Sequence, residues 1–178
     1  MTTKADMLSC FDAVAGSQSE YLEEHTDNRR RSQLKQSPKD TLVGTWVQVS
    51  LDTVSLDGTR RPLYGENAKG MIIYTRDGYF TLMQASVDLP KLKSGLPSKA
   101  TPEEAKAVIA NSIAYFGRYS LDEATMVLSL DIQASTFANL TGNSSEKRNI
   151  TSLTVSELKF NRPFVKDVTL EAVFKRAE

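Results

Sequence analysis

An alternation of apolar and polar residues, which recurs from Leu42 to Arg176, constrains the fold of this chain more than any other feature. Successive side chains of a β-strand point to opposite faces of a sheet, so a period of two predicts strands with one buried face. The pair Asp77-Gly78 separates two such runs, 70–75 and 79–84. An Asp-Gly pair in this position is a strong signal of a β-hairpin. The sequence therefore predicts antiparallel β-structure.

About eight strands are expected. Their predicted ranges are 42–51, 70–75, 79–84, 115–121, 126–135, 148–153, 157–161 and 168–176. Many short strands joined by turns favour an antiparallel barrel or a sandwich. A single helix interrupts them, because Thr101, Pro102 and Glu104 form a capping-box sequence that predicts a helix over 102–113.

Residues 1–40 differ from the rest of the chain. Met7, Leu8, Phe11 and Val14 form a short apolar stripe at helical spacing, and a polar tract follows it. One interpretation is a solvated tail, and the other is a helix that packs on the barrel or on a second subunit as a lid or dimer contact. We therefore predict an N-terminal arm over 1–40 and a barrel domain over 41–178.

Composition excludes several function classes. Lys plus Arg and Asp plus Glu both number 22, and the resulting net charge of zero argues against general nucleic-acid binding. One cysteine, Cys10, and one histidine, His25, leave no set of ligands for a zinc or iron–sulfur site. No apolar run approaches the roughly 20 residues of a membrane helix, and no secretory signal is evident. The sequence predicts a cytoplasmic protein without metal or redox cofactor.

Three stretches resemble one family in the same order along the chain. Leu42-Val43-Gly44-Thr45-Trp46 resembles the Gly-x-Trp opening strand of lipocalin and calycin barrels. The hairpin 70–78 resembles the second-strand hairpin of the small lipocalin-like domain family. Thr101-Pro102-Glu103-Glu104, followed by 115–119, resembles that family's helix and next strand. The resemblance covers residues 41–176 and implies a closed, roughly eight-stranded antiparallel barrel with a central cavity.

The resemblance leaves the function open. Related calycin-type barrels include carriers of apolar molecules and cofactor-free cyclases, and the fold alone does not choose between them. Relatives often place a histidine in the strand equivalent to 126–135, but this chain has Leu130 and Asp131 there. Histidine acid–base chemistry therefore cannot be transferred to this chain.

Four residues are candidates for catalysis. Tyr74 and Tyr119 could each direct a hydroxyl group at a ligand oxygen from a barrel wall. Arg148 could hold a carbonyl or enolate oxygen. Asp131 becomes a candidate acid or base only if the polar face of its strand points inward, because burial would then raise the pKa of its carboxyl group. Each of these residues also has a purely structural interpretation.

Other residues are candidates for the cavity wall. Trp46 is expected to close one end of the barrel, with Arg176 or Lys175 stacked on its ring. A period of two places Gln48 and Ser50 on the same face as Trp46. The remaining candidates, on the predicted strands, are Ile72, Leu82, Gln84, Phe116, Gln133 and Phe160.

The sequence thus predicts that a small apolar, oxygenated molecule binds inside the barrel. The favoured function is a cofactor-independent isomerase or cyclase of natural-product biosynthesis, acting by confinement and hydrogen bonding. The alternative is a non-catalytic carrier with the same pocket. The expected partner is a small apolar ligand, with neither nucleic acid nor membrane, and a homodimer stays open as one of the alternatives for the N-terminal arm.

Overall fold

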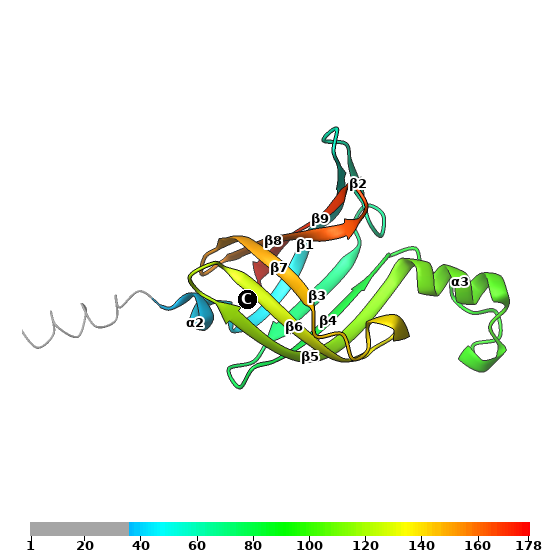
Figure 1. The fold of residues 1–178 in the computed structure, drawn as a ribbon. Helices are drawn as coiled ribbons and strands as arrows, with labels where there is room; N and C mark the ends of the chain where they lie inside the picture. The colour runs from blue at the N-terminus through cyan, green and yellow to red at the C-terminus, as the bar shows by residue number, and fades with distance from the viewer. Residues whose placement is uncertain (1–35) are drawn as a thin grey trace, which may run out of the picture. The chain divides into compact units, whose positions relative to one another are not determined.

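The computed structural model describes residues 36–178, which form a closed antiparallel β-barrel (Figure 1). The strand order is β1-β3-β4-β5-β6-β7-β8-β9, and β9 pairs back with β1 to close the barrel. The strands are β1 (Gly44–Ser55), β2 (Arg60–Pro62), β3 (Lys69–Tyr74), β4 (Tyr79–Ala85), β5 (Ser112–Asp122), β6 (Val127–Ser135), β7 (Glu146–Leu153), β8 (Glu157–Val165) and β9 (Val168–Arg176). The short β2 pairs only with the end of β1. The predicted barrel of about eight strands is confirmed.

The predicted hairpin is also present. β3 pairs with β4 in a register that sets Tyr74 opposite Phe80, and Gly78 has a φ of 88° in the turn between them. This left-handed conformation is the reason that glycine follows Asp77. The Thr75 side chain braces the turn, because its Oγ1 accepts a hydrogen bond from the Tyr79 amide at 3.0 Å.

The helices lie in the segments that precede or connect the strands. α3 (Pro102–Asn111) begins with the predicted capping box, in which Thr101 and Glu104 each accept a hydrogen bond from the other's backbone amide. It ends two residues before the predicted position, since Ser112 already pairs with Ala85 in the sheet. Two short 3₁₀ helices, η1 (Pro97–Lys99) and η2 (Ala138–Leu140), lie in loops.

The start of the first strand was predicted wrongly. Leu42 belongs to a short helix, α2 (Pro38–Leu42), and β1 begins at Gly44. Ser37 caps this helix by accepting a hydrogen bond from the Asp40 amide, and Pro38 occupies its first turn. The Leu42 carbonyl accepts a hydrogen bond from the Trp46 indole at 2.8 Å, which fixes the helix against the strand.

The barrel interior contains an apolar core. Its largest fully buried side chains are Trp46, Tyr74, Phe174, Leu42, Ile72, Leu128, Leu130, Ile132 and Leu158. These residues come from five of the strands and from α2, so the core links elements far apart in the sequence. Their packing fills one part of the barrel and leaves another part hollow.

A β-bulge changes the alternation within β1. The register with β9 shifts between Gln48 and Ser50, and Val49 is 59% exposed. Past the bulge, Leu51 is the residue that points into the barrel, with 4% exposure. The predicted inward position of Ser50 is therefore wrong, because one extra residue reverses the phase of the strand.

The predicted N-terminal stripe of Met7, Leu8, Phe11 and Val14 lies outside the described residues. The same is true of Cys10. The division into an arm over 1–40 and a barrel domain over 41–178 stays a prediction. No helix in the described part of the chain is long and apolar enough to cross a membrane.

Candidate functional site

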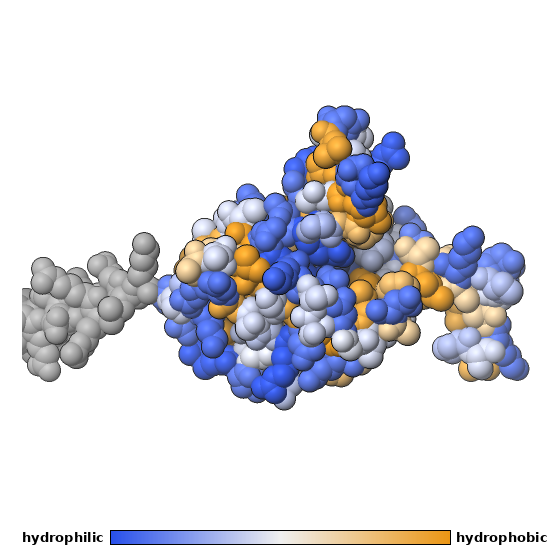
Figure 2. Space-filling view, in the orientation of Figure 1, coloured by the Kyte–Doolittle hydropathy of each residue, from blue (hydrophilic) through white to orange (hydrophobic). Residues whose placement is uncertain are grey.

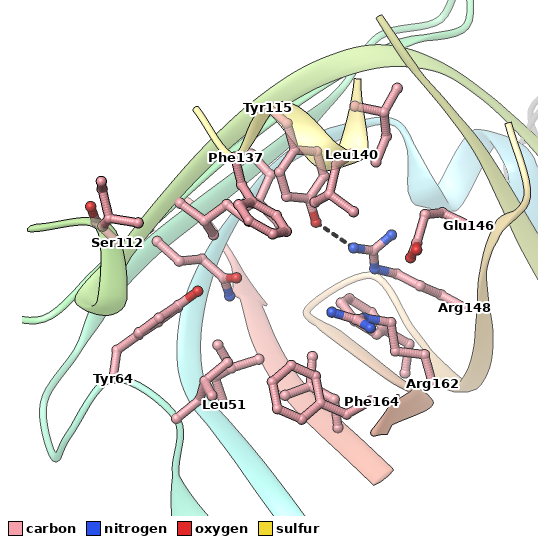
Figure 3. Close-up of a pocket in the computed structure, with 18 residues that line it drawn as sticks. Leu51, Tyr64, Ser112, Tyr115, Phe137, Leu140, Glu146, Arg148, Arg162 and Phe164 are labelled. Carbon is pink, nitrogen blue, oxygen red and sulfur yellow. Dashed lines mark hydrogen bonds between the residues drawn. The ribbon is translucent and has the colours of Figure 1, made fainter. Parts of the chain in front are cut away.

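A cavity of about 410 Å³ lies inside the barrel (Figure 3). This volume falls within the roughly 300–1,000 Å³ range of small-molecule pockets. Its walls come from strands β1, β4, β5, β6, β7, β8 and β9, from α3 and η2, and from two loops. The lining residues are Leu51, Leu63, Tyr64, Leu82, Gln84, Ile109, Ser112, Ile113, Tyr115, Ile132, Phe137, Leu140, Glu146, Arg148, Phe160, Arg162, Phe164 and Leu170.

Arg148 on β7 is the most buried charged residue among those described, with 3% of its surface exposed. Its Nη2 donates a hydrogen bond to the hydroxyl group of Tyr115 on β5, two strands away in the sheet (Figure 3). Its Cζ lies 5.1 Å from the centroid of the Phe160 ring, within reach of a cation–π interaction. Nε and Nη1 are both buried and have no hydrogen-bond partner among the described residues.

Arg162 on β8 adds a second guanidinium group to the same cavity. Its Nη1 donates a hydrogen bond to the Pro163 carbonyl at 3.0 Å, while its buried Nε has no partner among the described residues. Burial lowers the pKa of Arg162, and the positive charge of Arg148 lowers it further. Both effects disfavour the charged form, but an arginine keeps its proton in proteins.

The other polar groups of the cavity do not neutralise this charge. Glu146 is the one carboxylate among the lining residues, against the two guanidinium groups, so the lining carries a formal excess of one positive charge. A Glu146 oxygen accepts a hydrogen bond from the Asn143 side chain at 3.4 Å. Tyr64 contributes a neutral hydroxyl group, because burial raises the pKa of this tyrosine.

Gln84 forms a polar part of the cavity wall on β4. It is 5% exposed, and its Nε2 donates a hydrogen bond to Gln48 Oε1 at 2.6 Å. The two amides therefore satisfy each other in part, which is the usual condition for burying polar groups.

Apolar side chains surround the opening of the cavity. Ile109, Phe137 and Phe164 line it and yet remain 67%, 47% and 38% exposed. Figure 2 shows apolar surface where the barrel wall meets α3. Within residues 36–178 there is no cluster of three or more His, Cys, Asp or Glu side chains able to hold a metal ion.

Comparison with known proteins places this barrel in a family. The model of the lipocalin-like domain matches residues 43–168. The chain belongs to the lipocalin-like domain family. The resemblance seen in the sequence is thereby confirmed, and the domain match includes most of the strands that line the cavity.

Several solved structures are similar to this lipocalin-like chain. One is a lipocalin-like protein from Bacteroides uniformis, with 16% sequence identity and a TM-score of 0.43. The alignment covers 77% of this chain and 99% of the Bacteroides uniformis protein. A protein from Bacteroides eggerthii has 12% sequence identity and a TM-score of 0.41, and the alignment covers 76% of this chain and 99% of that protein. A redesigned β-barrel has 14% sequence identity and a TM-score of 0.40, and the alignment covers 81% of this chain and 98% of the redesigned protein. The comparison with curated proteins gave no match.

The lipocalin-like barrel brings four of the sequence candidates together. Arg148, Leu82, Gln84 and Phe160 all line the cavity. The family and the cavity are both consistent with binding of a small molecule.

Both candidate tyrosines lie elsewhere. Tyr74 and Tyr119 pack edge to face with ring centroids 5.0 Å apart, and neither lines the cavity. The Tyr119 hydroxyl donates a hydrogen bond to the Thr75 carbonyl at 2.7 Å, which ties β5 to the β3–β4 turn. Burial raises the pKa of both tyrosines. Tyr74 and Tyr119 therefore have a structural role, which was the alternative to catalysis that the sequence left open for them.

Three candidates are on the outer surface of the barrel. Leu128, Leu130 and Ile132 point inward on β6, so the exposed side chains of Asp131 and Gln133 point outward. Phe116 is 49% exposed on the outer face of β5. Placing these three residues at an internal site was therefore wrong. On β6 the reason is that the apolar face has the stronger tendency to be buried, and on β5 the buried positions are Tyr115 and Tyr119, which alternate with Phe116.

Two further candidates belong to the core. Ile72 is 1% exposed and does not line the cavity. Trp46 is completely buried, and Arg176 stacks on its ring with Cζ 4.2 Å from the centroid. Arg176 is therefore the cation from the last strand that was expected to stack on this tryptophan.

Sequence reasoning missed two central residues of the cavity, Tyr115 and Arg162. Tyr115 lies four positions before the candidate Tyr119 on β5, and Arg162 lies two positions after the candidate Phe160 on β8. The period of two would have placed both side chains on the inner face.

Proposed function

We propose that the barrel cavity binds a small, largely apolar molecule that carries oxygen atoms. The single observation that carries this proposal is the cavity of about 410 Å³, whose walls are mostly apolar and whose opening leaves Ile109 and Phe137 exposed. A ligand in this cavity would remove apolar surface from water at roughly 25 cal/mol per Å². Gln84, Tyr115 and Arg148 would bind its oxygen atoms.

A carrier needs no more than this cavity, whereas a cofactor-independent isomerase or cyclase of natural-product biosynthesis needs reactive groups within it. One observation favours the enzyme: Glu146, Tyr115 and Arg148 line the same cavity (Figure 3). Together they offer a carboxylate that can accept a proton and two donors that can bind an oxyanion.

For an isomerase, the proposed steps conserve atoms and electrons. The Glu146 carboxylate takes a proton from a carbon atom next to a carbonyl group, and the electron pair moves onto the carbonyl oxygen. Arg148 and Tyr115 stabilise that enolate by hydrogen bonding. Where the substrate also carries a C=C double bond conjugated with this enolate, return of the proton to the far carbon atom of the resulting dienolate shifts the double bond, gives the isomer and restores the carboxylate, so no oxidant or reductant is needed.

The binding proposal is tested by titrating the protein with 1-aminoanthracene, a neutral fluorescent probe. We expect saturable binding that Ser112→Trp abolishes, because Ser112 lines the cavity and a tryptophan there would fill it. Ser120→Trp is the matched control, since Ser120 is exposed on the same strand. Absence of binding, or equal binding by both variants, would contradict the proposal.

The enzymatic proposal has a separate test that needs no knowledge of the natural substrate. We expect the protein to accelerate deuterium exchange at the carbon next to the carbonyl group of 1-tetralone in D₂O, measured by NMR. Glu146→Gln should remove the acceleration, and Glu66→Gln, at an exposed loop position, should retain it. Probe binding without accelerated exchange would favour the carrier.

A further inference from the structure

We propose that the cavity selects ligands that carry a carboxylate group, which Arg148 binds with Tyr115 and Arg162 beside it. This inference rests on the proposed function, because it specifies the class of molecule that enters the same cavity.

The first argument is the hydrogen-bonding state of Arg148. Its side chain is 3% exposed, and two of its three guanidinium nitrogens have no partner among the described residues. A buried charge without partners costs several kcal/mol, so natural proteins pair such groups or use them. A carboxylate is the acceptor that best fits a guanidinium group, and its hydrogen bonds to arginine are charge-assisted.

The second argument is the charge of the cavity. Arg148 and Arg162 face one carboxylate, that of Glu146, and among the described residues neither arginine forms an ion pair. The excess of one positive charge matches an anion that carries a single negative charge. Figure 3 places both guanidinium groups on the same side of the cavity, so one ligand anion can interact with both.

The third argument is the direction of the hydrogen bond between Arg148 and Tyr115. The tyrosine oxygen accepts this bond, which leaves its own O–H free to donate. An oxygen atom of the ligand can accept from it. The apolar part of the ligand would then lie against Leu82, Phe160 and Leu170, which line the same cavity.

The experiment compares 2-naphthoate with 2-naphthylmethanol, which has the same ring system without the charge. Affinities for both are measured at pH 7 by calorimetry on the full chain and on Arg148→Met. We expect naphthoate to bind the unmodified protein about 10- to 100-fold more tightly than the alcohol, the range typical of a hydrogen bond to a charged group. Arg148→Met should lose this preference, because its affinity for naphthoate should fall far more than its affinity for the alcohol.

Two controls make the result specific. Arg118→Met removes an arginine from the outer wall, where its Cζ lies 4.4 Å from the Tyr79 ring centroid, and should keep the preference. Arg162→Met tests the second guanidinium group and should reduce the preference in part. The melting temperature of free Arg148→Met should be unchanged or higher, because this substitution removes a buried charge with incomplete pairing.

Equal affinities for the two probes, or a preference that survives Arg148→Met, would overturn the carboxylate inference. Binding of 1-aminoanthracene distinguishes this failure from failure of the proposed function. If the neutral probe binds in the cavity while naphthoate has no advantage, only the carboxylate inference fails. If none of the probes binds, the proposed function fails as well.

Discussion

The guanidinium group of Arg176 covers the indole ring of Trp46, with its Cζ 4.2 Å from the ring centroid. The same group donates hydrogen bonds to the carbonyl oxygens of Val43 at 2.9 Å, Val155 at 2.6 Å and Thr41. One side chain of the last strand therefore binds the first strand, the segment before it and the loop between β7 and β8. This cluster closes the barrel where β9 meets β1.

Arg176→Met should destabilise the fold without changing the cavity. The variant loses a cation–π contact and three hydrogen bonds to backbone carbonyls, and we expect the free energy of unfolding to fall by about 2–4 kcal/mol. Urea denaturation measures this change. Binding of 1-aminoanthracene to the folded variant should remain, since Arg176 does not line the cavity. An unchanged unfolding midpoint would contradict the closing role.

The amide pair Gln48 and Gln84 should show energetic coupling. Replacing either residue by leucine leaves the other amide without its partner, and we expect each single variant to lose about 1–3 kcal/mol. The double variant should lose less than the sum of the two, because neither polar group then remains. A double-mutant cycle by urea denaturation measures the coupling, and additive losses would contradict it.

Gly117→Ala should disturb the contact between β5 and β6. A Cβ atom at this position would lie 1.9 Å from the Asp131 carbonyl oxygen, which belongs to the backbone and cannot move aside. We expect a loss of about 1–3 kcal/mol or more. Gly70→Ala is the matched comparison, because its Cβ would meet the flexible side-chain end of Gln48 at 2.3 Å. A larger loss for Gly70→Ala in thermal unfolding would contradict this explanation.

Stability should fall at alkaline pH through Tyr74. Burial raises the pKa of this tyrosine in the folded state, whereas an unfolded tyrosine ionises near pH 10. Stability from this group is therefore complete below about pH 10 and decreases above it, by up to about 1.4 kcal/mol per pH unit. Tyr74→Phe should reduce the slope between pH 10 and 11 in urea denaturation. Identical slopes for the two proteins would contradict this role.

The fold followed from the sequence because its signals were local and agreed with one another. The Asp77-Gly78 turn set the β3–β4 hairpin, and Thr101 with Glu104 set the start of α3. The short helix α2 was missed because five residues are too few to show a helical period, although Ser37 before Pro38 is a capping signal.

The candidate site was harder to predict because it depends on which face of each strand is buried. A bulge at Val49 reversed the phase of β1, and no glycine marks that position in the sequence. On β6 the apolar face points inward, and Asp131 on the opposite face therefore lies on the outer surface. The contact of Arg148 with Tyr115 depends on how β5 and β7 pair on either side of β6, across 33 positions of sequence, which no local pattern describes.

A crystal structure of the protein with 2-naphthoate tests the central claim most directly. The account predicts naphthalene rings inside the barrel between Leu82, Phe160 and Leu170, and a carboxylate oxygen about 2.7–2.9 Å from a guanidinium nitrogen of Arg148. Density for naphthoate only on the outer surface, with the cavity filled by rearranged side chains, would contradict the account.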